Sequence, residues 1–321
     1  MAVPTIHVGL GLIGQRVCAT GRREGIYRPV AAVDPAPRLA GRDLGELLGA
    51  AADGVTVRAT LGEALATAAE PPRLALHATR STVRAVADEL IALVRAGCDV
   101  VSTCEELAAP WLRAPEVADE VDNAARAAGR RIVGAGVNPG FAMDLLPLVL
   151  AQASSDVRAI TIRRAQDPLK RRPAFQHKVG VGRTRAECEA DIEAGTFGHV
   201  GLAESAEALA LALGWELQGV RETLRLVEGD EGKVRGVRQT LSAGTPDGRR
   251  LRLRFWALAG LRRDSDVCVI GGDPPLRMFL PGGAAGDQAT ANLVLSAARR
   301  LARVEPGLHV GADLPLGVAA R

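Results

Sequence analysis

The first 140 residues alternate between short apolar runs and longer amphipathic segments, and this alternation restricts the fold more than any other feature. The apolar runs are rich in β-branched or small residues and lie at 5–10, 27–34, 73–79, 99–103 and 130–136. Strand, helix and strand at this spacing form right-handed βαβ units around a parallel sheet. The sequence therefore predicts an α/β fold whose N-terminal part is a doubly wound parallel sheet of the Rossmann type.

Residues 81–97 show the helical pattern that connects two of these strands. Val83, Val86 and Leu90 recur with a period near 3.6 residues, so one face of the segment is apolar. We expect Ser81 to cap the start of this helix and Gly97 to end it.

After about residue 150 the chain changes to strand-like runs separated by turn signals such as EGDEGK and GTPDGRR. Several of the runs alternate apolar with polar residues, which is typical of an antiparallel or mixed sheet with one solvated face. A helical insertion interrupts them, and an amphipathic helix follows them. We therefore predict a dinucleotide-binding domain at 1–142, an α+β domain for substrate binding and dimerisation at 143–285, and a C-terminal helix and tail at 286–321 that pack back on the first domain.

The composition excludes several classes of protein. The 40 Lys and Arg residues are scattered along the sequence, and the formal net charge is +3. Nucleic-acid binding normally needs a concentrated basic face, so we expect no nucleic-acid partner. No run approaches the length of about 18 apolar residues that a membrane span needs, so we expect no membrane partner either.

Five cysteines are spread along the chain with no CxxC pair. This spacing favours neither a disulfide framework nor a zinc site, and we expect no metal. The N-terminal residues lack the features of a signal peptide. We therefore expect a protein of the reducing cytoplasm.

A GxGxxG sequence, Gly9-Leu10-Gly11-Leu12-Ile13-Gly14, directly follows the first predicted strand and begins a helix. The first glycine permits a tight turn, the second lets a pyrophosphate approach the backbone, and the third lets helix and strand pack closely. The helix N-terminus then faces the phosphates with its partial positive charge. The motif predicts a dinucleotide site.

Asp34 ends the second predicted strand, 20 residues after the last of these glycines. A carboxylate at this point hydrogen-bonds a ribose 2′-hydroxyl, which favours NAD. Arg38 and Arg42 follow closely and could bind a 2′-phosphate, so the cofactor is NAD or NADP.

Three loops follow the carboxyl ends of neighbouring predicted strands, where ligands bind in open parallel sheets. The first contains Ala78, Thr79 and Arg80, the second runs from Ser102 and Thr103 to Glu106, and the third is GAGVNPG at 134–140. We expect these loops to lie on the nicotinamide side of the site.

Glu105 and Glu106 follow directly on an apolar strand. Acids in a first helical turn complement the helix dipole, which explains one of them as structural. Neighbouring side chains point in different directions, so we expect one of the two to face the site and transfer protons. The residues alone do not decide which.

His199 lies between glycines in GTFGHVGL, where close approach to a substrate competes with a purely structural role. His177 stands among cations in RRPAFQHK, and we expect it to face solvent.

The blocks VSTCEELAAPW, GAGVNPGFAMDLLPL, RRPAFQHKVGVG and AGTFGHVGLAES, together with the C-terminal GDQATANLVLSAARRLARVEPGLHVGADLPL, resemble the 2,4-diaminopentanoate dehydrogenase family. This family shares the dihydrodipicolinate-reductase-like Rossmann architecture and includes native NAD(P)-dependent amine dehydrogenases. The resemblance extends from the glycine motif to the terminal DLPL.

The resemblance implies reversible oxidative deamination of an amine to a ketone or aldehyde plus ammonia, with a carboxylate of STCEEL handling the amine. By position this role falls to Glu105, with Glu106 second. The resemblance also places Asn138, Phe141 and His199 in the substrate pocket, with a weaker match at Arg172. Asn138 is expected to reach the cofactor as well.

The substrate is either a diamino acid or a simple alkylamine. Arg164, Arg171 and Arg172 would clamp a substrate carboxylate, or they form an ordinary solvated charge run. A homodimer through the sheet of the second domain is expected. The alternatives are a dihydrodipicolinate-reductase-like oxidoreductase acting on C=N or C–OH without free ammonia, and a non-catalytic dinucleotide-binding sensor.

Overall fold

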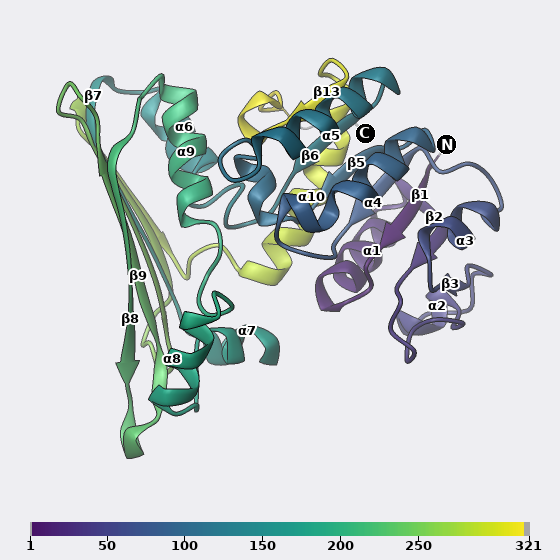
Figure 1. The fold of residues 1–321 in the computed structure, drawn as a ribbon, viewed down its shortest axis with the longest axis horizontal. Coiled ribbons are helices and arrows are strands. Elements are labelled where there is room, and N and C mark those ends of the chain that lie inside the picture. The colour runs from purple at the N-terminus through teal and green to yellow at the C-terminus, as the bar shows by residue number, and fades with distance from the viewer. Residues whose placement is uncertain (1, 318–321) are drawn as a thin grey trace. The chain divides into compact units, whose positions relative to one another are not determined.

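The computed structural model describes residues 2–317, which form two compact units (Figure 1). The first unit contains the described residues up to Gly136 together with those from Asp287 onward. The second unit contains Val137–Gly286.

The first unit is built on a seven-stranded parallel sheet with the strand order β13-β6-β5-β4-β1-β2-β3. The strands are β1 (Val3–Val8), β2 (Tyr27–Val33), β3 (Val57–Arg58), β4 (Leu74–His77), β5 (Asp99–Ser102), β6 (Arg131–Gly134) and β13 (Gly307–His309). The helices are α1 (Leu12–Glu24), α2 (Leu44–Leu47), α3 (Leu61–Ala66), α4 (Val83–Arg95), α5 (Pro115–Ala127) and α10 (Gly286–Leu301).

This order confirms the predicted doubly wound sheet, because the chain reverses its direction of winding between β1 and β4. Ligands bind beyond the carboxyl ends of the strands at such a switch point. The five strand-like runs of the sequence correspond to β1, β2, β4, β5 and β6. Strands β3 and β13 were not predicted, because they contain only two and three residues and are too short to show a period.

Helix α4 buries the apolar face that its period predicted, including Val83, Val86 and Leu90. Its predicted start was wrong in detail. The cap residue is Thr82, and its side chain makes no capping hydrogen bond. Ser81 contributes only its backbone carbonyl, which accepts a hydrogen bond from the backbone N–H of Glu106 at 3.1 Å.

The C-terminal segment completes the first unit. Helix α10 packs its buried residues against the sheet, and the hydroxyl of Tyr27 donates to the carbonyl of Leu295 at 3.1 Å. Strand β13 then pairs with β6 at the sheet edge.

The second unit is built on a six-stranded mixed sheet with the order β12-β11-β7-β10-β9-β8. Strands β7 and β10 pair in parallel, and the other pairs are antiparallel. The strands are β7 (Ser155–Gln166), β8 (Gln218–Glu228), β9 (Val234–Gly244), β10 (Arg250–Leu258), β11 (Ser265–Asp273) and β12 (Leu276–Pro281). The helices are α6 (Leu145–Ala151), α7 (Pro173–Lys178), α8 (Arg185–Glu193) and α9 (Leu202–Leu213).

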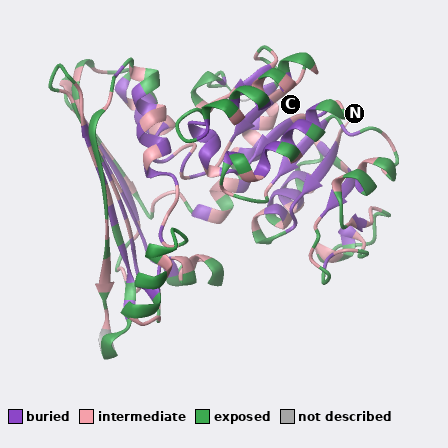
Figure 2. Cartoon of the chain, viewed as in Figure 1, coloured by how far each residue is buried: buried purple, intermediate pink, exposed green. Residues whose placement is uncertain are grey.

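Helices α6 and α9 cover one face of this sheet, which we call the inner face. Alternate residues of β10, such as Leu251, Leu253 and Phe255, are buried on it in the core of the unit. Figure 2 shows buried stretches along the strands of this sheet and on the helices that cover it. The residues between them form the outer face, which no helix of the second unit covers in Figure 1. No helix among residues 2–317 is long and apolar enough to cross a membrane.

Candidate functional site

The glycine motif forms a tight turn between β1 and α1, next to the end of the neighbouring strand β4. The backbone N–H of Gly9 donates to the carbonyl of Val33 at 2.9 Å, and that of Ala78 donates to Val8 at 2.7 Å. Gly9 has a φ of +84°, and a Cβ on it would lie 2.4 Å from the carbonyl oxygen of Ala78. A Cβ on Gly14 would lie 1.9 Å from the carbonyl oxygen of Gly9. Only glycine fits at these two positions.

Gly11 differs, because a Cβ added there would meet no atom within 4 Å. This glycine is the N-cap of α1 and makes no side-chain capping hydrogen bond, so the first backbone N–H groups of the helix keep their capacity to donate. Leu12, the first helical residue, is 59% exposed. An open helix N-terminus beside a tight turn fits the pyrophosphate of a dinucleotide.

Asp34 lies at the end of β2 and contacts the same turn. One carboxylate oxygen accepts from the backbone N–H of Leu10 at 2.7 Å, and the other accepts from Ala36 at 2.9 Å. Arg38 and Arg42 are exposed, and their side chains form no hydrogen bond or ion pair within residues 2–317. The acid expected to bind a ribose and the cations expected to bind a 2′-phosphate therefore lie in the same segment of the first unit.

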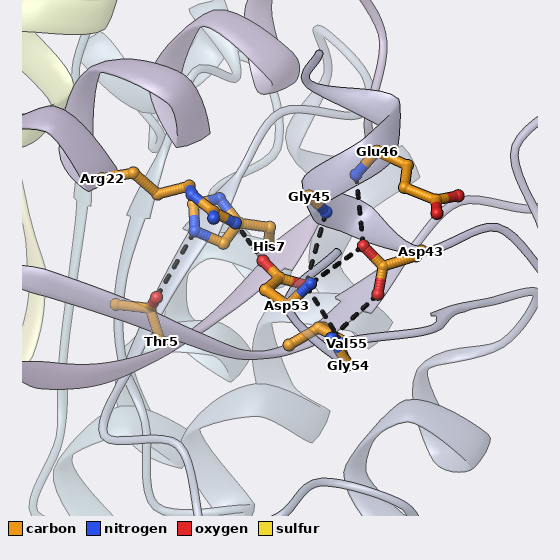
Figure 3. A network of polar contacts seen from close by, with 9 residues as sticks. All are labelled: Thr5, His7, Arg22, Asp43, Gly45, Glu46, Asp53, Gly54 and Val55. Atoms are coloured by element: carbon orange, nitrogen blue, oxygen red, sulfur yellow. Dashed lines mark hydrogen bonds and ion pairs between the residues drawn. The ribbon is translucent and has the colours of Figure 1, made fainter. Parts of the chain in front are cut away.

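The segment that follows is held by two aspartates (Figure 3). The carboxylate of Asp43 accepts from the backbone N–H groups of Glu46, Asp53 and Gly54 at 3.2, 3.2 and 2.9 Å. Asp53 forms an ion pair with Arg22 of α1. Nearby, burial and the charge of Arg22 lower the pKa of His7 to about 4, so this histidine is neutral. The loop is therefore tied to the helix that begins at the glycine turn.

Backbone hydrogen bonds join the three predicted loops at the carboxyl edge of the sheet. The N–H of Thr103 donates to the carbonyl of His77 at 2.9 Å, and the N–H of Ala135 donates to Ser102 at 2.8 Å. The loops after β4, β5 and β6 thus begin side by side, as the order of their strands requires.

A partly buried polar network around His77, which was not predicted from the sequence, lies under these loops. Nδ1 of His77 is 2.8 Å from the hydroxyl of Ser102, and Nε2 is 2.8 Å from a carboxylate oxygen of Glu89. Thr79 also reaches Nε2, at 2.9 Å. The hydrogen bond with His77 is the main cause that lowers the pKa of Glu89. The Ser102 side chain is buried and engaged within the protein, and the only sequence signal for the network was a histidine in an apolar strand.

The two adjacent glutamates differ in their surroundings. Glu106 is 8% exposed, and its carboxylate accepts from the backbone N–H of Val83 at 2.8 Å. It therefore takes the capping role at the start of α4 that the sequence analysis gave to Ser81. A carboxylate at a helix N-terminus is favoured by both the hydrogen bond and the helix dipole.

Glu105 is the first residue of the 3₁₀ helix η1 (Glu105–Ala108) and is half-buried. Its side chain forms no hydrogen bond or ion pair with another residue of 2–317. Leu107 packs this helix closely against Gly134 of β6. A Cβ added to Gly134 would lie only 2.6 Å from the Cβ of Leu107. Burial raises the pKa of the preceding Cys104 thiol to about 12, so that thiol is neutral. The uncommitted acid of this segment is Glu105.

The second unit holds a separate polar cluster around His199. Nε2 of His199 is 2.8 Å from the amide nitrogen of Asn138, and its ring stacks on Phe255 with centroids 4.4 Å apart. Gln239 binds the backbone of His199 on both sides, accepting from its N–H at 2.6 Å and donating to its carbonyl at 3.0 Å. Gln239 and Phe255 alternate with less buried residues in their strands, and this alternation was the only sequence signal for them.

Burial, followed by the charge of Lys178, lowers the pKa of His199 to about 3. The ring is therefore neutral, and an amide nitrogen that donates to Nε2 places the ring proton on Nδ1. The amide oxygen of Asn138 is buried and has no hydrogen-bond partner within residues 2–317. A buried polar atom of this kind normally binds water or a ligand.

Asp144 shapes the GVNPGF segment that contains Asn138. Its carboxylate accepts from the backbone N–H of Gly140 at 2.7 Å and from the hydroxyl of Ser205 at 2.9 Å. Burial raises the pKa of this acid. Phe141, the residue after the turn, is half-buried.

The three arginines considered as a carboxylate clamp have different roles. Arg164 is buried and binds the Asp266 carboxylate at 2.6 Å and the Ala284 carbonyl at 2.7 Å, so it is neither solvated nor available to a substrate. Arg171 binds the side chain of Gln166 at 2.6 Å. Arg172 is half-buried at the start of α7. His177 is exposed, as predicted.

Residues 2–317 contain no group of three or more His, Cys, Asp or Glu side chains placed to hold a metal ion. The five cysteines are free and buried. Burial raises the pKa of four of these thiols to about 12, at Cys18, Cys98, Cys104 and Cys268.

The doubly wound sheet, the glycine turn and the acid after β2 define a Rossmann-type dinucleotide-dependent oxidoreductase. Comparison with known proteins identifies the family. Residues 141–321 match the family model of the 2,4-diaminopentanoate dehydrogenase C-terminal domain. The chain belongs to the 2,4-diaminopentanoate dehydrogenase family, which confirms the resemblance found in the sequence.

The 2,4-diaminopentanoate dehydrogenase of Acetoanaerobium sticklandii is 28% identical over 260 residues, which cover 75% of this chain and 73% of that protein. An amine dehydrogenase structure from Mycobacterium smegmatis has a TM-score of 0.88 at 20% identity, covering 100% of this chain and 98% of that one. The WlbA dehydrogenase of Bordetella pertussis, solved with NADH and UDP-GlcNAcA, has a TM-score of 0.56 at 14% identity, covering 90% and 81%. The two structural likenesses confirm the α/β dehydrogenase fold. Membership of the family places the chain among the NAD(P)-dependent amine oxidoreductases.

Proposed function

We propose that this chain interconverts an amine with a ketone or aldehyde plus ammonia, and that Glu105 handles the amine. The observation that carries the assignment is the difference between the paired acids. Glu106 is committed to the N-terminus of α4, whereas the half-buried carboxylate of Glu105 has no partner within residues 2–317. The family supports the reaction class, and this difference between the two acids supports Glu105 as the residue.

The chemistry needs a carboxylate beside the reacting carbon. A free alkylamine is protonated at neutral pH, with a pKa of about 10 by analogy with lysine. Hydride leaves the carbon only when the amine is neutral, and the nicotinamide, when bound, carries this hydride. Glu105 binds the ammonium and removes its proton, and it then positions water against the iminium. In the reverse direction it holds ammonia for attack on the carbonyl.

The first unit supplies the proposed cofactor contacts, and NAD and NADP both remain candidates. Asp34 would bind a ribose hydroxyl, and Arg38 a 2′-phosphate. The remaining proposed contacts of this unit are Gly9, Gly11, Leu12, Ile13, Gly14, Ala78, Thr79, Arg80, Ser102 and Thr103. Asn138, a residue of the second unit, is proposed as a further cofactor contact.

For the substrate we propose contacts from Asn138, Phe141, Arg172 and His199 of the second unit. His199 is neutral and offers an Nδ1–H donor rather than a positive charge, and the buried amide oxygen of Asn138 can accept a hydrogen bond. A substrate carboxylate, as in a diamino acid, would need the charge of Arg172. A simple alkylamine or ketone would not.

The test is oxidation of NADH and NADPH, in parallel assays, with a panel of ketones and aldehydes in the presence and absence of ammonium. We expect oxidation that requires both ammonium and the carbonyl compound. Oxidation without ammonium would instead support the alternative of a dihydrodipicolinate-reductase-like enzyme acting on C=N or C–OH. Tight cofactor binding without turnover on the whole panel would support a sensor.

The expected homodimer is proposed through the outer face of the six-stranded sheet. This face is uncovered within its own unit and carries large exposed apolar side chains, including Phe279 at 60% exposure and Val269 at 38%. The five unpaired, buried cysteines fit the proposed location in a reducing cytoplasm.

A further inference from the structure

The outer face of the six-stranded sheet concentrates positive charge. In β10, Arg250, Arg252 and Arg254 alternate with buried residues, so all three project from the outer face. Their neighbours in the strand register lie on the same face. In this way the face collects eight arginines, with three on β10, two on β8 and one each on β7, β9 and β12: Arg250, Arg252, Arg254, Arg221, Arg225, Arg163, Arg238 and Arg277.

Among the described residues of the six strands, no acid away from the strand ends lies on the same face as these arginines. Within the six strands, Glu222 and Asp266 pair with Leu241 and Arg164, which belong to the inner face. The other acids of the strands lie at or next to strand ends, at Asp156, Glu228 and Asp273. None of the eight arginines forms an ion pair with a residue of 2–317, and the Nε atom of Arg163 is buried without a hydrogen-bond partner.

The arginines surround apolar groups. The guanidinium groups of Arg163 and Arg238 lie over the ring of Trp256, at 5.2 and 5.1 Å from its centroid. Phe279 and Val269 are exposed on the same face. The face therefore has apolar surface that favours self-association and a charge that opposes it.

A two-fold dimer brings the same surface of each copy together. Through this face it would bring two sets of eight unpaired arginines together, and like charges across an interface cost several kcal/mol. Sodium chloride only screens this repulsion. An oxyanion with two or more charges can instead bind two guanidinium groups by paired hydrogen bonds and neutralise both.

We propose that multivalent oxyanions of the phosphate type bind to the outer face of the six-stranded sheet and control self-association of the chain. The strand register supports a specific place, because Arg254 and Arg163 are direct neighbours on β10 and β7, and Arg252 follows two residues along. Their Cα atoms are separated by about 5 to 7 Å, from the usual strand spacing and rise, so one phosphate can contact two side chains. This inference rests on the proposed homodimer.

The test measures the mass of the full chain by sedimentation equilibrium in sodium chloride, sodium phosphate and sodium sulfate at matched ionic strength. We expect dimerisation at least about tenfold tighter in phosphate and sulfate than in chloride, which corresponds to about 1.4 kcal/mol. Equal association in the three salts would overturn the proposal, because screening alone depends on ionic strength.

A charge-neutralised variant sharpens the test. The double substitution Arg252→Gln/Arg254→Gln should dimerise in chloride and lose most of its response to phosphate. The matched control is Arg84→Gln/Arg95→Gln, which removes two exposed arginines from α4 and should behave as the unmodified chain. If dimerisation of the Arg252→Gln/Arg254→Gln variant depends on phosphate as strongly as dimerisation of the unmodified chain, the proposal is overturned.

The remaining outcomes separate this inference from the proposed reaction. A chain that stays monomeric in every salt contradicts the homodimer and the inference, and it leaves the ammonium-dependent assay unaffected. Phosphate binding seen by titration calorimetry without any change in mass would also contradict the inference. Binding of a short DNA duplex without dimerisation would show that the face serves a polyanion instead.

Discussion

The carboxyl edge of the seven-stranded sheet and the polar cluster of the six-stranded sheet are organised differently. At the edge, side chains such as Asp34 and Glu106 bind backbone N–H groups of neighbouring segments. In the cluster, side chains from distant positions bind one another, as Asn138 and His199 do, and Gln239 binds the backbone of His199. Side-chain pairs such as His77 and Ser102 also lie under the edge, but the dinucleotide turn itself is shaped by steric fit at its glycines. Substitutions should therefore act through steric fit in the first region and through lost polar partners in the second.

The largest effect on stability is expected in the second region, at the buried ion pair. Arg164→Met leaves the Asp266 carboxylate buried without its cation, and the side chains are only 3% and 2% exposed. We expect the free energy of unfolding to fall by about 3 to 5 kcal/mol, the usual cost of breaking such a pair. Urea unfolding measures it. The double variant Arg164→Met/Asp266→Leu should lose less unfolding free energy than Arg164→Met alone. An equal loss in both variants would mean that packing rather than the buried charge is responsible.

In the first region the glycine turn should respond to a single methyl group. Gly14→Ala adds a Cβ 1.9 Å from the Gly9 carbonyl oxygen, so the turn must shift. Strain of about 1 to 3 kcal/mol should lower the free energy of unfolding and the melting temperature, measured by urea and thermal unfolding. The shifted turn should also weaken cofactor binding, measured by fluorescence titration with NADH and NADPH.

The matched control for this turn is Gly11→Ala, whose Cβ meets no atom within 4 Å. It should keep the melting temperature of the unmodified chain and weaken cofactor binding only. A lower melting temperature for Gly11→Ala than for Gly14→Ala would contradict the steric account.

The cluster should make the second unit sensitive to acid. The folded pKa of His199 is about 3 and its ordinary value is 6.5, so between these pH values the unfolded chain binds more protons. The stabilisation that comes from the neutral His199 is therefore complete above pH 6.5, and the free energy of unfolding falls by about 1 kcal/mol per pH unit below it. Urea unfolding at pH 7, 6 and 5 gives this free energy at each pH, and it should fall less steeply with decreasing pH for His199→Gln. The exposed His177→Gln is the control, and it should keep the original slope.

The smallest effects compare two candidate caps of α4. Glu106→Gln weakens the hydrogen bond to Val83 and should cost about 1 kcal/mol, within the range for helix caps. Ser81→Ala should change the unfolding free energy by less than about 0.5 kcal/mol, since its side chain is not the cap. A larger loss for Ser81→Ala would restore the capping assignment made from the sequence.

The sequence predicted the carboxyl edge well, because strand ends and glycine spacing are local features. It could not choose between Glu105 and Glu106, since the partner that commits Glu106 is Val83, 23 residues away. The sequence indicated His199 as a candidate but not its partners Gln239 and Phe255, because the contacts of these two residues with His199 depend on how the strands pair. The alternation RLRLRFW already contained the arginines of the outer face. Judged only by their spread along the chain, these arginines were described as scattered, and the sheet register brings them together.

The central claim is that Glu105, and not Glu106, handles the amine. The direct measurement is the ammonium-dependent amination rate of Glu105→Gln and Glu106→Gln, with cofactor affinity and folding measured for both. The account predicts that Glu105→Gln folds, binds cofactor normally and loses at least about tenfold in rate, as expected for a lost acid–base group. Full activity of Glu105→Gln beside an inactive but folded Glu106→Gln would contradict it.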